Sequence, residues 1–234
     1  KELLISYDQS KSIELKSIKD LIAEAVDCLV LGDKTLLLLF CDDYPPEEYL
    51  NNHMVNVMIM SLVLGLELGY NKSKLNELGM GALMHDVGMN SVKEIALKHQ
   101  RLSNEEFSQI KKHPDYGADF LSKIENISQM VITTVREVHE RINGEGYPKG
   151  LKGEEICEYA RLITTVDVYE ALTHSRTYRK KYSPHDAIKE ILALDTAYFD
   201  PAILKVLVNQ VGIYPIGSWA ELNTGEIARV IASN

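Results

Sequence analysis

Most of the chain carries apolar residues at intervals of three and four positions, a spacing that predicts helices. The clearest example is residues 12–31, whose apolar positions share one stripe with polar positions opposite. Because almost every segment repeats this pattern, the chain is expected to be all-α. Helices are predicted at residues 12–31, 35–40, 47–68, 75–86, 103–113, 116–124, 128–141, 158–175, 184–194 and 201–210.

Several helix ends can be placed from local residues. Ser103-Asn-Glu-Glu106 has the form of a capping box, which begins a helix. Ser128 is expected to be an N-cap. Pro114 follows His113, so this histidine is placed at the end of its helix, where the helix dipole favours a histidine.

The last stretch has a different period. Residues 217–231 alternate around Asn223-Thr-Gly225, which predicts a small β-hairpin. We therefore divide the chain into an N-terminal helical segment or linker at 1–44, a main domain at 45–211, and a hairpin extension packed on that domain at 212–234.

Composition excludes several classes of protein. The net charge of −9 gives no long-range attraction for a nucleic acid polymer. The longest uncharged apolar run, residues 54–66, is too short for a membrane span. Three widely spaced cysteines favour a reduced, cytoplasmic compartment. An anionic substrate would therefore need local positive charge, from metal ions or from the basic run at residues 176–181.

Histidine and aspartate side chains fall at unusual places on the predicted helices. Asp167 has apolar neighbours, and a buried carboxylate must be paired or bind a metal. Helices whose His and Asp residues converge are how bundle cores build metal sites. The candidate ligands are His53, His85, Asp86, His113, His139 and Asp167.

Ordinary structural roles remain open for each of these residues taken singly. A lone histidine is usually a core or surface residue, and Asp167 could pair with Arg136 or Arg161. The other three histidines, in polar and loop-like surroundings, are predicted to be surface residues: His99, His174 and His185.

The donor set indicates the chemistry. Histidine and carboxylate ligands without cysteine suit Fe, Mn or Zn. A shared aspartate can bridge two ions, and two ions can activate water and stabilise an in-line phosphoryl displacement. Arg176 and Arg179 could bind phosphate oxygens through paired hydrogen bonds, although such basic runs are often only solvated.

Four ordered motifs identify a family resemblance. HDVG at 85–88, HPDYG at 113–117, VHERINGEGYPKGL at 138–151 and ARLITTVDVYEALTHSRTYR at 160–179 resemble the HD-GYP domain, as does the NNHMVNV stretch around His53. The likeness runs from about residue 45 to the C-terminus. It implies an HD-superfamily helical bundle with N-terminal helices and a small C-terminal β-hairpin, which acts as a metal-dependent phosphohydrolase.

The resemblance implies hydrolysis of the bacterial signalling molecule cyclic di-GMP to pGpG, or to GMP after a second cut. It implies two divalent metal ions, Fe or Mn first and Zn, Ni or Mg as alternatives. His85 and Asp86 would be catalytic. One ion would be held by His53, His85, Asp86 and Asp167, the other by Asp86, His113 and His139. The residues expected to meet the substrate are Gly146, Tyr147, Pro148, Arg176 and Arg179.

The departures from the family pattern matter equally. Val138 stands where a histidine is usual, and Met89 where a lysine is expected near the scissile phosphate. Asn143 and Glu170 replace aspartates, which are milder changes, and Tyr49 stands where members with a third metal have a glutamate. We therefore expect a slow phosphodiesterase with a weaker second metal site.

Three other functions stay open at this point. The domain could bind cyclic di-GMP or a protein partner without turnover. It could hydrolyse another nucleotide, such as the mixed GMP-AMP cyclic dinucleotide, or serve as a helical interaction domain. An upstream sensory domain or a homodimer formed through residues 12–31 would supply regulation.

Overall fold

The computed structural model describes residues 15–33, 35–39, 49–96, 98, 102–174, 181–194, 198–212 and 219–231. These residues form α-helices, two short 3-10 helices (η2 and η3) and one pair of strands, so the all-α prediction is confirmed. The elements are α2 (Leu15–Val30), α3 (Leu36–Leu39), α4 (Tyr49–Glu67), α5 (Lys72–Met84), η2 (Val87–Val92), α6 (Lys93–Ala96), α7 (Asn104–Ile110), α8 (His113–Leu121), α9 (Gln129–Glu137), η3 (Gly153–Glu155), α10 (Glu158–Thr173), α11 (Pro184–Ala193), α12 (Pro201–Val211), β1 (Trp219–Glu221) and β2 (Ile227–Arg229).

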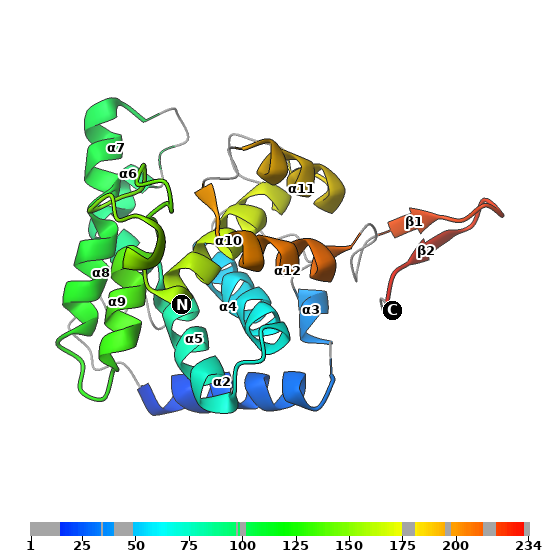
Figure 1. Ribbon diagram of the computed structural model, residues 1–234, viewed down its shortest axis with the longest axis horizontal. Helices are drawn as coiled ribbons and strands as arrows, with labels where there is room; N and C mark the ends of the chain where they lie inside the picture. Colours follow the sequence, from blue (N-terminus) through cyan, green and yellow to red (C-terminus); the bar gives the residue numbers. More distant parts are fainter. Residues whose placement is uncertain are drawn as a thin grey trace.

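Helix α4 forms the centre of the hydrophobic core. It is apolar almost all round, as expected of a buried helix, and Val57 and Ile59 are buried on opposite sides of it. Helices α5 and α10 pack directly against α4. Helix α2 lies across the ends of α4 and α5, while α8 and α9 stand on the far side of α5 (Figure 1). The core residues that flank His53 on α4 therefore hold it in the middle of the bundle.

The N-terminal segment shares this core. Helix α2 buries Ile22 and Val26 in the same cluster as α4 and α5. The division of the chain at residue 44 stays a prediction. None of the described helices has both the length and the hydropathy that crossing a bilayer requires.

Two capping predictions are confirmed, whereas several helix boundaries differ from those predicted: α5 begins at Lys72, three residues earlier than expected, and α7 ends at Ile110. Ser103 and Glu106 form a capping box, and the Ser128 hydroxyl accepts from the backbone of α9. His113, however, begins α8 rather than ending the preceding helix. Pro114 lies in the first turn of α8, where a helix tolerates proline because the amide there needs no helical partner. Helix α9 ends at Glu137, earlier than expected.

The C-terminal hairpin is present, with β1 and β2 antiparallel and Ala220 opposite Ala228. It extends away from the helices (Figure 1). Trp219 and Ile227 are 71% and 73% exposed. The expected packing of the hairpin on the domain stays a prediction.

Candidate metal centre

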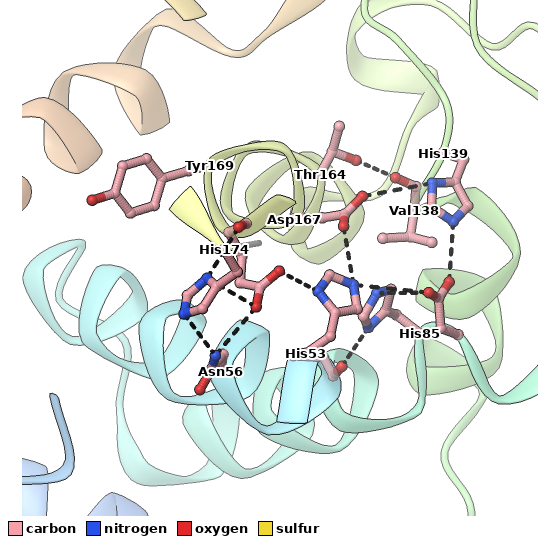
Figure 2. Close-up of polar contacts among 12 residues, drawn as sticks. His53, Asn56, His85, Val138, His139, Thr164, Asp167, Tyr169 and His174 are labelled. Atoms are coloured by element: carbon pink, nitrogen blue, oxygen red, sulfur yellow. Dashed lines mark hydrogen bonds and ion pairs between the residues drawn. The ribbon is translucent and has the colours of Figure 1, made fainter. Parts of the chain in front are cut away.

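The six predicted ligand residues converge from separate helices onto one place in the bundle core. Figure 2 shows His53, His85, His139 and Asp167 at this place. The first comes from α4, the next two from the end of α5, and the fourth from the start of α8. The fifth, His139, follows the end of α9, and the sixth, Asp167, lies on α10. Four of them are buried, with exposed fractions of 0–8%: His53, His85, Asp86 and His113. Bringing them together requires the whole bundle, because no single helix carries more than two.

Asp86 lies between two pairs of histidines. Its Oδ2 is 3.6 Å from Nε2 of His85 and 3.8 Å from Nε2 of His53. Its Oδ1 is 3.2 Å from Nε2 of His113 and 3.4 Å from Nε2 of His139. The carboxylate thus turns one oxygen to each pair. Two groups result, His53–His85–Asp86 and Asp86–His113–His139, and each could hold a metal ion; we call them the first and second groups.

Asp167 spans the same two groups from α10. Its Oδ1 is 3.3 Å from Nε2 of His53, and its Oδ2 is 3.8 Å from Nδ1 of His139. The alternative pairing of this carboxylate with an arginine is wrong. Arg136 pairs with Asp119 at 2.9 Å. Arg161 lies 3.7 Å from Asp200.

The histidine nitrogens fit a divalent cation. The Nδ1 atoms of His85 and His113 each lie 2.8 Å from a backbone carbonyl, of Ala82 and Ile110 respectively. A carbonyl only accepts, so Nδ1 donates to it, which leaves Nε2 as the ring atom that can bind a metal. Both Nε2 atoms are buried without a hydrogen-bond partner, and both face Asp86. Lone pairs that converge with a carboxylate are a metal-binding donor set.

Electrostatics at the centre favour charged carboxylates. Burial alone would lower the pKa of His53, but Glu170 and Asp167 outweigh it and raise that pKa to about 10. Burial raises the pKa of Asp86, but the surrounding histidines, His85 first, hold it well below its usual range. Burial lowers the pKa of the His139 ring, which is therefore neutral at pH 7. A cation that enters the first group would displace the proton of His53.

Glu140 ties down the loop that follows α9. Its carboxylate is 1% exposed and accepts from the backbone N–H groups of Lys149 at 2.7 Å, Gly150 at 3.2 Å and Leu151 at 3.0 Å. Sequence reasoning did not assign this residue a role. The signal was available, because a glutamate next to a candidate ligand and before a glycine-rich loop is a natural acceptor for loop amides.

The Gly146-Tyr147-Pro148 loop lies against the second group. The Tyr147 ring stacks on the His139 ring, with centroids 5.1 Å apart and planes at 20°. The Tyr147–Pro148 peptide is cis. A Cβ on Gly146 would lie 2.4 Å from Cα of Glu140, so only glycine fits this approach. Lys111 places its Nζ 5.9 Å from the Tyr147 ring centre, which puts a cation at the loop.

Gly88 allows the close backbone contact that places His113 in the second group. A Cβ at this position would lie 2.0 Å from the carbonyl oxygen of His113. The backbone of η2 can therefore approach the start of α8 only because residue 88 is glycine. This approach brings His113 next to Asp86, two positions before Gly88 in the chain.

Val138 and Met89, the two main departures from the family pattern, both lie close to the candidate metal centre in sequence. Val138 is 0% exposed and belongs to the hydrophobic core, while its carbonyl accepts a hydrogen bond from the Thr164 hydroxyl. Met89 is partly buried in η2, where its backbone N–H donates to the Asp86 carbonyl at 2.9 Å. The valine side chain offers no ligand atom, and the methionine side chain brings no charge.

Other predictions divide as follows. His174 is 5% exposed, so its assignment to the surface is wrong, whereas His185 is exposed as predicted. The two arginines expected to bind phosphate, Arg176 and Arg179, lie outside the described residues, as does His99.

Comparisons with known proteins agree with this architecture. A family model for the HD domain matches residues 41–203. The chain is 32% identical over 222 residues to a cyclic di-GMP phosphodiesterase of Pseudomonas aeruginosa, covering 94% of this chain and 53% of that protein. It is also 32% identical over 180 residues to a cyclic di-GMP phosphodiesterase of Borreliella burgdorferi, covering 76% of this chain and 47% of that protein.

A solved structure has the same fold. A protein of Bdellovibrio bacteriovorus described as an HDG"Y"P protein superposes with a TM-score of 0.71, at 22% identity, over 88% of this chain and 63% of that one. The chain belongs to the HD domain family, which confirms the resemblance that its motifs indicated. It spans about half the length of the curated relatives it matches.

Proposed function

We propose that this domain hydrolyses cyclic di-GMP to linear pGpG, and to GMP where a second cut follows, at a centre of two divalent metal ions. One observation carries the proposal: Asp86 turns one carboxylate oxygen to each of two histidine pairs. Such an arrangement suits two neighbouring ions with a shared ligand, and two-ion centres suit phosphate-ester hydrolysis. The two cyclic di-GMP phosphodiesterases that match most of this chain support the choice of substrate.

The first ion would be held by His53, His85, Asp86 and Asp167. The second would be held by Asp86, His113 and His139, with one ligand fewer because Val138 supplies none. When bound, the ions supply activated water for attack on phosphorus and neutralise charge on the phosphate oxygens. Histidine and carboxylate donors favour Fe or Mn, with Zn, Ni or Mg as alternatives.

The chain itself contributes orientation and positive charge. The loop at Gly146, Tyr147 and Pro148 lies over His139 and forms one wall against which the dinucleotide would lie. Lys111 adds a cation beside this wall. Arg176 and Arg179 are proposed to bind phosphate oxygens. Because Met89 brings no charge to the scissile phosphate, turnover is expected to be slow.

Binding without turnover is the second candidate function. Val138 and Met89 favour it, since one removes a metal ligand and the other a cation. A weak second site would leave a domain that captures the cyclic dinucleotide and reports its presence to a partner. Both candidates use the same metal centre and the same loop, and they differ in the fate of the ligand.

The deciding experiment measures metal content and turnover on the same sample. The purified domain is loaded anaerobically with Mn²⁺ or Fe²⁺, its metal content is measured, and digests of cyclic di-GMP and of cyclic GMP-AMP are separated by chromatography. Asp86→Ala should abolish turnover, whereas Asp119→Ala, which removes a surface partner of Arg136, should not. Bound but intact cyclic di-GMP would favour the second candidate. Absence of metal, binding and turnover would overturn both.

A further inference from the structure

A buried polar chain lies behind His53, on the side away from the metal centre (Figure 2). Oε2 of Glu170 is 2.5 Å from Nδ1 of His53. Oε1 of Glu170 is 3.2 Å from Nδ2 of Asn56 and 3.2 Å from Nδ1 of His174. Asn56 and His174 also approach each other, with Nδ2 and Nε2 3.4 Å apart.

All four of these polar residues are buried. Glu170 is 0% exposed, His53 and Asn56 are 2% exposed, and His174 is 5% exposed. A buried carboxylate is costly unless both oxygens are matched by donors. Here one oxygen faces His53 and the other faces the Asn56 amide and the His174 imidazole. These buried polar residues contact the candidate metal centre through His53.

The direction of the hydrogen bond fixes the His53 ring. A carboxylate accepts, so Nδ1 of His53 donates to Glu170. Nε2 then points the other way, where it lies 3.3 Å from Asp167 and 3.8 Å from Asp86. An acceptor behind a metal-binding histidine holds the ring orientation and strengthens the ring nitrogen as a ligand.

The other buried histidines have a different support. Nδ1 of His85 and Nδ1 of His113 meet backbone carbonyls, which are neutral acceptors. A carboxylate acceptor is the stronger partner because the hydrogen bond is charge-assisted. The acceptor behind His53 is thus stronger than the acceptors behind His85 and His113.

We propose that Glu170 is a positioning residue that sets the metal affinity of the first group through His53, and that Asn56 and His174 hold Glu170 in place. This inference rests on the proposed metal centre and adds residues that touch neither metal nor substrate. It also gives meaning to position 170, where glutamate replaces the usual aspartate: the longer side chain reaches His53 while its other oxygen stays with His174.

The test is a Mn²⁺ titration of the metal-free full chain, with free Mn²⁺ followed by electron paramagnetic resonance. Glu170→Gln keeps the shape of the side chain and removes its charge. It should raise one of the two Mn²⁺ dissociation constants by about 10–100-fold. The other constant should change much less. Asn56→Leu, which keeps the branched side-chain shape but removes the donor to Glu170, should shift the same constant in the same direction by a smaller factor. The Asn56→Leu variant also tests the inference if Glu170→Gln fails to fold.

Ile163→Val is the matched control, because it loosens the packing of α10 without touching the polar chain. It should leave both Mn²⁺ constants unchanged. Equal weakening of both constants in Glu170→Gln, or a loss that the control reproduces, would reduce Glu170 to a stability role and overturn the inference. Two unchanged constants in Glu170→Gln would overturn it too. The readout is independent of turnover, so an inactive domain that binds Mn²⁺ would contradict the proposed function alone.

Discussion

Tyr147 stacks on His139, with ring centroids 5.1 Å apart and planes 20° apart. The loop after α9 therefore covers a candidate ligand of the second group directly. An aromatic contact of this kind is worth about 0.5–1.5 kcal/mol beyond the area it buries. That is enough to bias the orientation of the His139 ring, and too little to hold it alone.

Removing the Tyr147 ring should weaken the second group. We expect Tyr147→Ala to reduce Mn²⁺ affinity there by about 2–10-fold, the equivalent of one lost aromatic contact. Tyr147→Phe keeps the ring and should bind Mn²⁺ like the parent. Titration of both variants checks the prediction, and equal loss in the two would point to the hydroxyl instead.

Removing the carboxylate of Glu140 should destabilise the fold. Three backbone N–H groups donate to it from the loop, and Glu140→Ala would leave them without this acceptor. The free energy of unfolding should fall by about 3 kcal/mol, given what charged hydrogen bonds contribute. Urea unfolding of the metal-free protein measures it. Glu154→Ala, at an exposed glutamate just after the loop, should change stability little; a similar loss in both would contradict the special role of Glu140.

Restoring a lysine at position 89 should speed the proposed hydrolysis. Met89→Lys would place a cation in η2 close to Asp86, and such transition-state charge is worth on the order of 10²-fold in kcat. Met89→Leu should leave turnover at the parent level. Steady-state kinetics on cyclic di-GMP with Mn²⁺ decides, and an unchanged kcat in the lysine variant would show that residue 89 does not face the scissile phosphate.

A histidine at position 138 tests whether the missing ligand can be replaced. Val138 is fully buried in the core, so Val138→His should cost about 1–3 kcal/mol of stability without metal. Added Mn²⁺ should stabilise the variant more than it stabilises the parent, because the new imidazole completes the second group. Thermal unfolding with and without Mn²⁺ measures both effects. An equal Mn²⁺ effect in the two proteins would assign residue 138 to the core alone.

The main elements of the bundle follow from hydrophobic periodicity, and the site follows from the polar residues that interrupt it. Asp167 is the clearest case, because a carboxylate among apolar neighbours had to find partners, and it lies by His53 and His139. The order of the motifs along the chain also predicted which of these residues form each of the two groups. Asp86 between the two groups was expected from a shared aspartate beside a histidine.

Two kinds of feature escaped prediction for physical reasons. His113 was placed at the wrong end of a helix, because proline both terminates a helix and fits its first turn. His174 was assigned to the surface, because its sequence neighbours are polar, whereas its burial comes from the packing of α10 on α4, where it lies next to Asn56. Neighbours four apart on one helix can pair, which was the one available signal.

The position of Asp86 has a consequence for how ions would load. An ion held in one group would alter the charge and orientation that the shared carboxylate offers to the other. Coupling of this kind is reciprocal, so each ion changes the affinity of its neighbour by the same factor. The affinity of the centre for each ion would then depend on whether the other ion is already bound.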